Sequence, residues 1–326
     1  MGFIIFLLSV LTLASSCQEG PDGEVFIGKP SGPYRVELRL DPGRPVAGQE
    51  TVLAYTVKDA KTGAPIPDLQ VLHERILHTF IVSRNLGYFV HTHHEDFFPL
   101  SPQDTANATF HYPHTFPHAG GYIVTTEFTH KDRTWFKRFE IVVGGDGERK
   151  APEEDLRREK LLGGYRISLR SSPDPPVAGH DVELVCRVET AAGKPVTDLS
   201  MYLGTEVHMA AWRLDSEHFG HQHTCTPEMA AMMAMMRDHT AGPEQMAKMM
   251  VQMMRGPAKQ VYTGPDLPVH HIFPEPGTYK LFFEFAPAGK TLVADFMVEV
   301  VEYSEGTNTT VHSIVPTNVS HSGHAS

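Results

Sequence analysis

Cysteine is scarce in this sequence of 326 residues, which contains only three. If Cys17 is set aside as part of a targeting segment, Cys186 and Cys225 remain, so the folded part can form at most one disulfide. Cys225 also extends a His-x-His pattern to His221-x-His223-x-Cys225, where a thiolate would be a soft metal ligand. Both interpretations of Cys225 remain open from the sequence.

Basic residues are the minority. There are 28 Lys and Arg against 39 Asp and Glu, which gives a formal net charge of −11. Because binding of nucleic-acid phosphates needs clustered Lys and Arg, we do not expect nucleic acid as a partner.

Catalytic motifs are also lacking. The sequence has no Gly-x-Ser-x-Gly elbow, no phosphate-binding glycine loop and no His-Glu-x-x-His zinc motif. No acidic residue near the histidines described below is marked as a general base by both copies of the repeat. We therefore do not expect an enzyme.

A hydrophobic run long enough to span a bilayer is missing, because the apolar stretch from Phe3 to Ala14 is too short. Its length fits the core of a signal peptide, and the small residues before Cys17 resemble a bacterial lipobox. We expect residues 1–17 to be a lipoprotein-type signal with Cys17 as the lipidated residue. The alternative is an ordinary secretory signal. Either interpretation implies the bacterial cell envelope, facing the periplasm with the outer membrane favoured, or secretion.

Histidine is abundant, with 20 residues, and two groups of four recur in the same arrangement. In each group a His is followed 13 residues later by His-x-His, and a further His precedes a Phe-Pro step. The first group is His78, His91, His93 and His114, and the second is His208, His221, His223 and His271.

The residues around each His-x-His predict a β-hairpin, because β-branched and aromatic residues flank a short turn. Facing positions in a hairpin have a constant sum. A turn centred on Asn85–Leu86 therefore places His78 opposite His93, and the second copy places His208 opposite His223.

His91 and His93 are two residues apart and so share one face of their strand. Three imidazoles then converge at cross-strand distances of about 4.5–5.5 Å between Cβ atoms, which suits a shared metal ion. We expect one ion per hairpin, with copper as Cu(I) or Cu(II) the first candidate and zinc the second. A buried histidine network without metal is the alternative.

The histidine groups lie within an internal repeat. Pro45–Gly48 recurs as Pro176–Gly179, and both copies consist of short alternating segments separated by Pro and Gly turns. This pattern predicts an all-β protein of two tandem immunoglobulin-like sandwiches. The expected order along the chain is an N-terminal linker at 18–31, the first domain at 32–145, a charged linker at 146–162, the second domain at 163–303 and a disordered tail at 304–326.

The second domain carries an insertion at 226–264 in which methionine is concentrated. Thr226 and Pro227 form a helix start, and the methionines that follow predict a helical hairpin with one Met-rich stripe on each helix. Residues 226–255 contain neither Leu nor Ile, and thioether sulfur suits Cu(I). Packing against the sandwich and a groove for a partner are the alternatives. The candidate soft-metal ligands are Met229, Met232, Met233, Met236, Met246, Met249, Met250 and Met253.

The ordered pattern of these residues resembles a known family. A strand with His, a Ser-Arg-Asn-Leu turn, a strand ending in His-x-His and then Phe-Pro-x-x-Gly-x-Tyr is similar to the YtkA/FixH-like domains of bacterial envelope proteins. The resemblance covers about residues 34–143 and 165–301. It implies small immunoglobulin-like sandwiches and a role near copper-handling and oxidase-assembly proteins.

Two functions are expected from these observations. The first is a lipid-anchored envelope protein that binds copper or a similar ion for resistance, storage or delivery, with a metal-handling envelope protein or an oxidase-assembly component as partner. The second is a structural or assembly factor whose Met-rich hairpin docks a partner.

Overall fold

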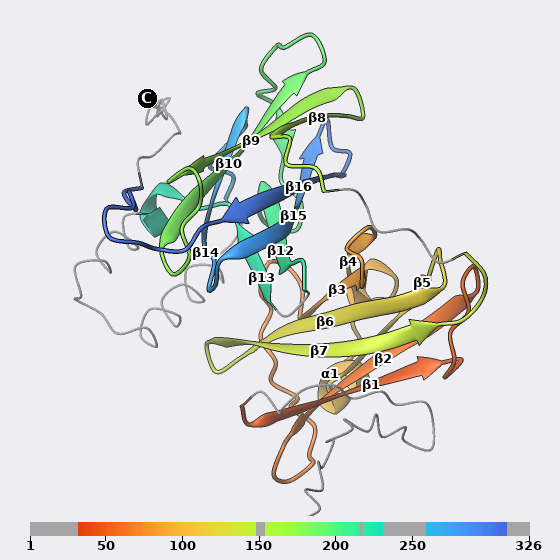
Figure 1. The fold of residues 1–326 in the computed structure, drawn as a ribbon. Helices are drawn as coiled ribbons and strands as arrows, with labels where there is room; N and C mark the ends of the chain where they lie inside the picture. Colours follow the sequence, from red (N-terminus) through yellow and green to blue (C-terminus); the bar gives the residue numbers. More distant parts are fainter. Residues whose placement is uncertain (1–31, 148–153, 216–217, 231–258, 312–326) are drawn as a thin grey trace, which may run out of the picture.

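The structure is a computed structural model that describes residues 32–147, 154–215, 218–230 and 259–311. Two antiparallel β-sandwiches follow each other along the chain, drawn from red to yellow-green and from green to blue in Figure 1. Within the described ranges, no helix is both long and apolar enough to cross a membrane.

The first sandwich consists of a three-stranded and a four-stranded sheet, with strand orders β1-β2-β5 and β4-β3-β6-β7. Alternate residues of β1, including Val36, Leu38 and Leu40, are buried between the sheets, as a half-buried strand requires. Two short helices connect β4 to β5, and Ser101 caps the second by accepting a hydrogen bond from the backbone N–H of Asp104. The elements are β1 (Tyr34–Asp41), β2 (Glu50–Asp59), β3 (Leu77–Ser83), β4 (Phe89–His93), η1 (His94–Asp96), α1 (Pro102–Asn107), β5 (Thr109–Thr115), β6 (Gly120–His130) and β7 (Arg133–Val143).

The second sandwich repeats this plan with an added edge strand. Its sheets have the orders β14-β10-β9-β8 and β13-β12-β15-β16. The short strand β11 pairs with the C-terminal end of β15. The added strand β8 comes from residues 159–162, which the sequence places in the charged linker, so the second sandwich begins earlier than expected. Its elements are β8 (Glu159–Leu162), β9 (Tyr165–Ser172), β10 (Asp181–Thr190), β11 (Leu199–Ser200), β12 (Val207–Arg213), β13 (Phe219–His223), β14 (Asp266–Ile272), β15 (Gly277–Pro287) and β16 (Leu292–Val300).

Only the beginning of the expected helical hairpin falls in the described part of the chain. Residues 227–230 are helical, and Thr226 caps them by accepting a hydrogen bond at 3.2 Å from the backbone N–H of Met229. Residues 231–258, for which the sequence predicts the rest of the hairpin, lie outside the described ranges, as do residues 1–31 with the expected signal and Cys17.

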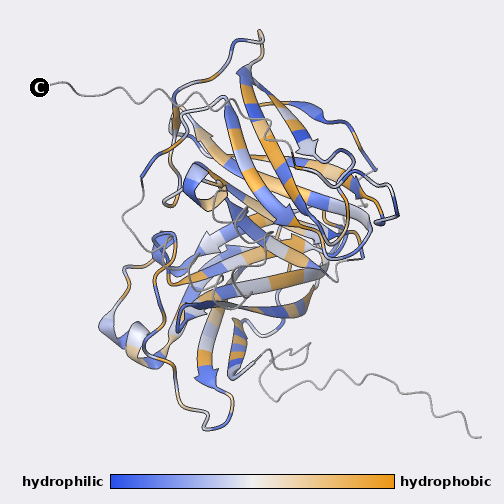
Figure 2. Cartoon of the chain, turned by 90° about the vertical axis from the view of Figure 1, so that its left-hand side faces the viewer, coloured by the Kyte–Doolittle hydropathy of each residue, from blue (hydrophilic) through white to orange (hydrophobic). Residues whose placement is uncertain are grey.

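The two sandwiches pack through their larger sheets. Figure 2 shows apolar and polar residues alternating along many strands, but all seven residues of β3 are buried. One face of β3 lies in the core of its own sandwich and the other contacts the second domain, and β12 is its counterpart there. An apolar cluster fills the contact between the domains: Phe80, Val82, Leu86 and Ile123 from the first, with Ala210, Trp212 and Phe282 from the second.

Candidate metal centre

The hairpin register that places the histidines is the one expected from the sequence. His78 pairs with His93 across β3 and β4, and His208 pairs with His223 across β12 and β13. The position of the turn in each hairpin, read from the sequence, was therefore sufficient to predict which histidines pair.

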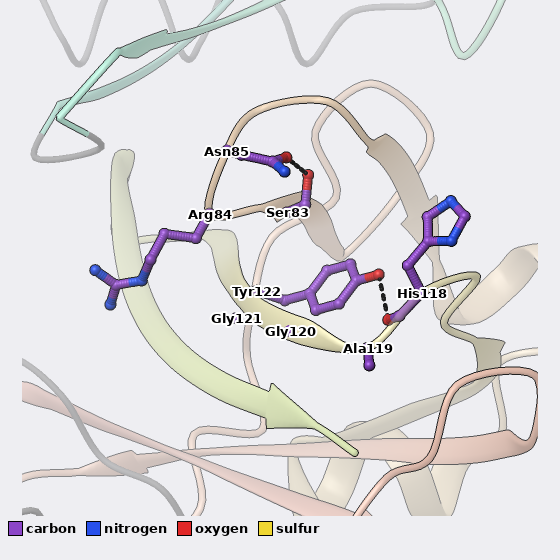
Figure 3. Close-up of a pocket in the computed structure, with 8 residues that line it drawn as sticks. All are labelled: Ser83, Arg84, Asn85, His118, Ala119, Gly120, Gly121 and Tyr122. Carbon is purple, nitrogen blue, oxygen red and sulfur yellow. Dashed lines mark hydrogen bonds between the residues drawn. The ribbon is translucent and has the colours of Figure 1, made fainter. Parts of the chain in front are cut away.

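The Ser-Arg-Asn-Leu turn fixes the register of the first hairpin (Figure 3). The hydroxyl of Ser83 donates to the side-chain oxygen of Asn85 at 2.7 Å and accepts hydrogen bonds from the backbone N–H groups of Gly87 and Tyr88. Leu86 takes a positive φ of 54°, which closes the turn. Because side chains alternate along a strand, a slip of one residue would turn the histidines to the other face.

A small pocket lies beside this turn and is bounded by Gly120, Gly121 and Tyr122 (Figure 3). The hydroxyl of Tyr122 donates to the backbone carbonyl of His118 at 2.8 Å, and Arg84 pairs with Glu140. The pocket is at the turn end of the hairpin, whereas the paired histidines are at the other end. It is therefore separate from the candidate metal site.

Three ring nitrogens converge in the first sandwich. Nδ1 of His78 lies 3.2 Å from Nε2 of His91 and 3.0 Å from Nε2 of His93, and the two Nε2 atoms are 3.0 Å apart. Three nitrogens bound to one tetrahedral ion at about 2.0–2.1 Å would be about 3.3 Å apart. The spacing is therefore close to that of a metal site, and we call these residues the first triad.

The other nitrogen of each ring in the first triad faces a hydrogen-bond acceptor. Nε2 of His78 lies 3.1 Å from the carbonyl oxygen of Leu72, which can only accept, so this nitrogen carries the proton. Nδ1 of His91 and Nδ1 of His93 lie 2.7 Å and 2.9 Å from carboxyl oxygens of Glu284 and Asp96. All three protons therefore point outward, and three lone pairs converge inside the triad. Such outer partners orient the imidazoles of metal sites.

Burial keeps these imidazoles neutral. It lowers the pKa of His78 and of His91 well below the usual value, with the neighbouring histidines adding to the effect. Burial also lowers the pKa of His93, although its hydrogen bond to Asp96 opposes this shift. Since a ligating His must be neutral, the triad is ready to bind an ion near pH 7.

The second sandwich holds a matching group, the second triad. Nδ1 of His208 lies 3.4 Å from Nε2 of His221. Their outward nitrogens face the carbonyl oxygen of Tyr202 at 3.0 Å and a carboxyl oxygen of Glu127 at 2.8 Å. Nε2 of His223 is shielded from solvent and has no hydrogen-bond partner among the described residues. A buried polar atom without a partner is costly, and a metal ion would satisfy it.

The two triads meet across the interface between the domains, near β3, β4, β12 and β13 in the middle of Figure 1. The ring centroids of His91 and His208 are 5.3 Å apart, and those of His91 and His221 are 5.4 Å apart. The prediction of one separate site in each sandwich is therefore corrected: each sandwich has its own triad, but the two are neighbours.

The sequence interpretation missed two buried acidic residues, Glu127 on β6 and Glu284 on β15. They occupy matched positions, five residues after Tyr122 and Tyr279, and both repeats carry Phe next to them. Both repeats therefore share an acid that contacts a histidine of a triad, on the outward side of the ring. The signal was available: a Glu within an apolar strand, present in both copies.

His73 is a further member of the cluster that spacing did not reveal. Its ring stacks on that of His223 with centroids 3.5 Å apart, so a residue of the first domain covers the second triad. His73 takes a positive φ of 47° at a tight turn, a conformation that is uncommon for residues other than Gly. The matched turn of the second domain has Leu203 at this place.

The structure does not bring the expected fourth histidines to the triads. His114 is on β5 in the other sheet of its sandwich, beside the hydroxyl of Tyr88 at 3.4 Å. His271 is on β14 and packs against Gly220, where an added Cβ would come within 2.5 Å of its ring. Because neighbouring residues of a strand face opposite sides, His271 lies on the opposite side of β13 from His221.

The cysteines are separate from the triads. Cys186 and Cys225 are both buried and free, so the disulfide that the sequence left open is not formed. Burial raises the pKa of Cys225 to about 12, and its Sγ contacts the carbonyl oxygen of Thr226 at 3.7 Å. The described part of the chain does not place it in a group with His221 and His223.

Of the candidate methionines, Met229 alone is described, and it is buried in the first helical turn of the insertion. The others lie outside the described ranges: Met232, Met233, Met236, Met246, Met249, Met250 and Met253.

Fold and site together define a tandem β-sandwich protein with one buried histidine triad in each half. The chain belongs to the family described as a domain of unknown function (DUF8832), whose sequence model matches residues 30–145 and again 160–302. The two matches fall on the two sandwiches. No curated protein matches the chain in sequence.

Solved structures resemble the chain only distantly. The chain is 12% identical to the Escherichia coli adhesin FdeC over 83% of this chain and 65% of that one, with a TM-score of 0.23. It is 13% identical to three N-terminal domains of the bacteriophage RB49 outer capsid protein Hoc over 82% and 59%, with a TM-score of 0.20. The chain thus spans less than two thirds of either. These comparisons do not support the YtkA/FixH name.

Proposed function

We propose that this protein binds transition-metal ions at its two histidine triads, with copper as the first candidate and zinc as the second. The observation that carries the proposal is the inward convergence of three lone pairs at 3.0–3.2 Å, with each outward nitrogen held by an acceptor. Without a cation or a proton between them, these lone pairs repel one another. A metal ion bound by all three nitrogens would remove this repulsion.

The donor set favours copper and zinc over calcium and magnesium. Neutral imidazole suits copper, zinc, iron and nickel, whereas the hard ions prefer oxygen. The carboxyl groups of Glu127 and Glu284 face outward nitrogens and not the converging ones. Copper binds more tightly than zinc at a given nitrogen site, and the Met-rich insertion offers thioethers that suit Cu(I).

A triad leaves a fourth coordination position open to water or to an incoming donor. We infer from this that an ion can be exchanged, as storage, resistance or delivery requires. The protein is proposed as a binding protein and not as an enzyme, since the sequence has no nucleophile or phosphate-loop motif. Its partner would be an acceptor of the ion, such as a metal-handling envelope protein or an oxidase-assembly component.

The proposed location is the bacterial cell envelope, with a lipid on Cys17 as the membrane anchor. The support is the short apolar run from Phe3 to Ala14 followed by small residues and Cys17. Cys17→Ala should release the protein from the membrane fraction. An unchanged distribution of that variant would remove the anchor from the proposal.

Metal binding is tested by titrating the metal-free full chain with Cu(II) or Zn(II) in competition with a chromophoric chelator. The wild type should bind tightly, and the double variant His91→Ala/His221→Ala should lose this binding. The matched control is His114→Ala/His271→Ala, which removes the same number of histidines outside the triads and should leave binding intact. If the control loses binding and the first variant keeps it, the triads are not the sites.

A second function is an assembly factor in which the histidines only stabilise the interface. It is favoured by the burial of the triads in the contact between the domains. Wild-type protein that stays metal-free in the titration would support it.

A further inference from the structure

We propose that the two triads form a single binuclear metal centre shared by the two domains, in which the ions influence each other. This proposal rests on the proposed function, because it requires that the triads bind ions.

Rings of different triads are as close as rings of one triad. Within the first triad the centroids are 4.5–5.5 Å apart. Between the triads, His91 lies 5.3 Å from His208 and 5.4 Å from His221, and His78 lies 5.6 Å from His221. The six imidazoles are therefore one continuous cluster. Ions held by its two halves would therefore lie close to each other.

Each half of the cluster is completed by the opposite domain. His91 of the first domain contacts Glu284 of the second, and His221 of the second contacts Glu127 of the first. His91 and His221 are matched positions of the repeat, and so are Glu127 and Glu284. The contact is thus reciprocal, as at a twofold interface between two copies of one protein. Neither triad has its full set of outer partners until the domains are docked.

The surroundings strengthen the interaction between the ions. The ring of Phe80 stacks on His91 with centroids 4.3 Å apart and lies 4.6 Å from His221, so one apolar side chain contacts both triads. The side chains of His91 and His221 are 0% exposed. Charges in such a dry environment interact far more strongly than in water.

The charge of the ions limits what the cluster can hold. Two neighbouring cations repel each other, and the repulsion scales with the product of their charges. A second divalent ion should therefore bind more weakly than the first, and two Cu(I) ions should repel each other less than two Cu(II) ions.

Electron paramagnetic resonance of the Cu(II)-loaded full chain tests the proposal, with bound copper counted after gel filtration. The controls are His78→Ala and His208→Ala, which each remove one triad but keep both crossing carboxyl contacts. Each should hold one ion and give an uncoupled spectrum. An equal mixture of these two variants is the reference for two ions that do not interact. Circular dichroism verifies that both are folded.

A wild type that holds two ions with a coupled spectrum that differs from the mixture supports the binuclear centre. A wild type that holds one ion, although each triad can bind alone, would overturn it. Two ions with the spectrum of the mixture would overturn the proposal and leave the proposed function standing. Absence of copper from the wild type and from both variants would overturn the proposed function itself.

Discussion

His91 and Glu284 belong to different domains, yet Nδ1 of His91 lies 2.7 Å from a carboxyl oxygen of Glu284, and both side chains are buried. The matched residues, His221 and Glu127, make the same contact at 2.8 Å in the opposite direction. Burial raises the pKa of Glu284 well above its usual value. A cation at the far side of the His91 ring favours the ionised carboxylate, which in turn makes the imidazole a better ligand.

Replacing Glu284 by Gln should weaken metal binding at the first triad by about 10–100-fold, because the amide keeps the shape but not the charge. The effect is isolated in a His208→Ala background, where the first triad is the one intact triad. Glu127→Gln in that background is the matched control and should change the affinity little. Equal losses in both variants would show that the acids act through the general field of the cluster and not through their contacts with His91 and His221.

The apolar contact between the domains should support metal binding without supporting either sandwich. Phe282 stacks on Phe89 of the first domain with centroids 4.4 Å apart, whereas its neighbour Phe283 lies in the core of the second sandwich. Phe282→Ala should lower the affinity of both triads while both domains stay folded. Phe283→Ala should instead destabilise the second sandwich by about 3–5 kcal/mol. Denaturant unfolding with chelator competition checks both outcomes, and unchanged affinity in Phe282→Ala would contradict the account.

Stability of the metal-free protein should fall as the pH is lowered. Burial lowers the pKa of His114 and of His271 to about 4, compared with about 6.5 in the unfolded chain. Between these values the unfolded chain binds more protons than the folded one, so the free energy of unfolding decreases from about pH 6.5 to about pH 4. Urea denaturation across this range measures the slope. His271→Gln should flatten it, and a slope that this variant leaves unchanged would contradict the assignment.

The Met-rich insertion should bind Cu(I) or Ag(I) independently of the histidines. The thioethers are not part of the triads, so this binding should persist in a His91→Ala/His221→Ala background, where both triads are removed. Leu and Met exchange at nearly constant volume and typically at under about 1.5 kcal/mol, so a Leu variant keeps the fold. In that background, Ag(I) titration should show loss of binding in the Leu variant; undiminished binding would assign the methionines to packing or to a partner surface. The variant replaces Met232, Met233, Met249, Met250 and Met253.

The sequence predicted the local geometry of the site well, because that geometry depends on short-range rules. Side chains alternate along a strand, and a turn fixes which residues face each other. These two facts were sufficient to pair His78 with His93 and to place His91 on the same face. They could not place His114 and His271, because a repeat shows that two positions correspond but not which sheet of a sandwich each occupies.

The meeting of the two triads could not be predicted from spacing, because the contact between His91 and Glu284 joins residues far apart in the chain. Two signals pointed to it nevertheless. The β3 segment lacks the polar face that a strand shows when only one of its sides is buried, and this indicates that both of its sides are covered. Glu127 and Glu284 lie within apolar strands at matched positions, and a buried acid needs a partner.

The central claim is that the triads hold metal ions, and the most direct measurement is the metal content of the full chain purified without chelators from cells grown with copper. Elemental analysis is made on three proteins that all carry the Met-to-Leu substitutions, so that these thioethers do not contribute. One keeps all histidines, one adds His91→Ala/His221→Ala and one adds His114→Ala/His271→Ala. The account predicts copper or zinc in the protein with all histidines and in the His114→Ala/His271→Ala variant, and none in the His91→Ala/His221→Ala variant. Equal metal content in all three proteins, or none in any of them, would contradict it.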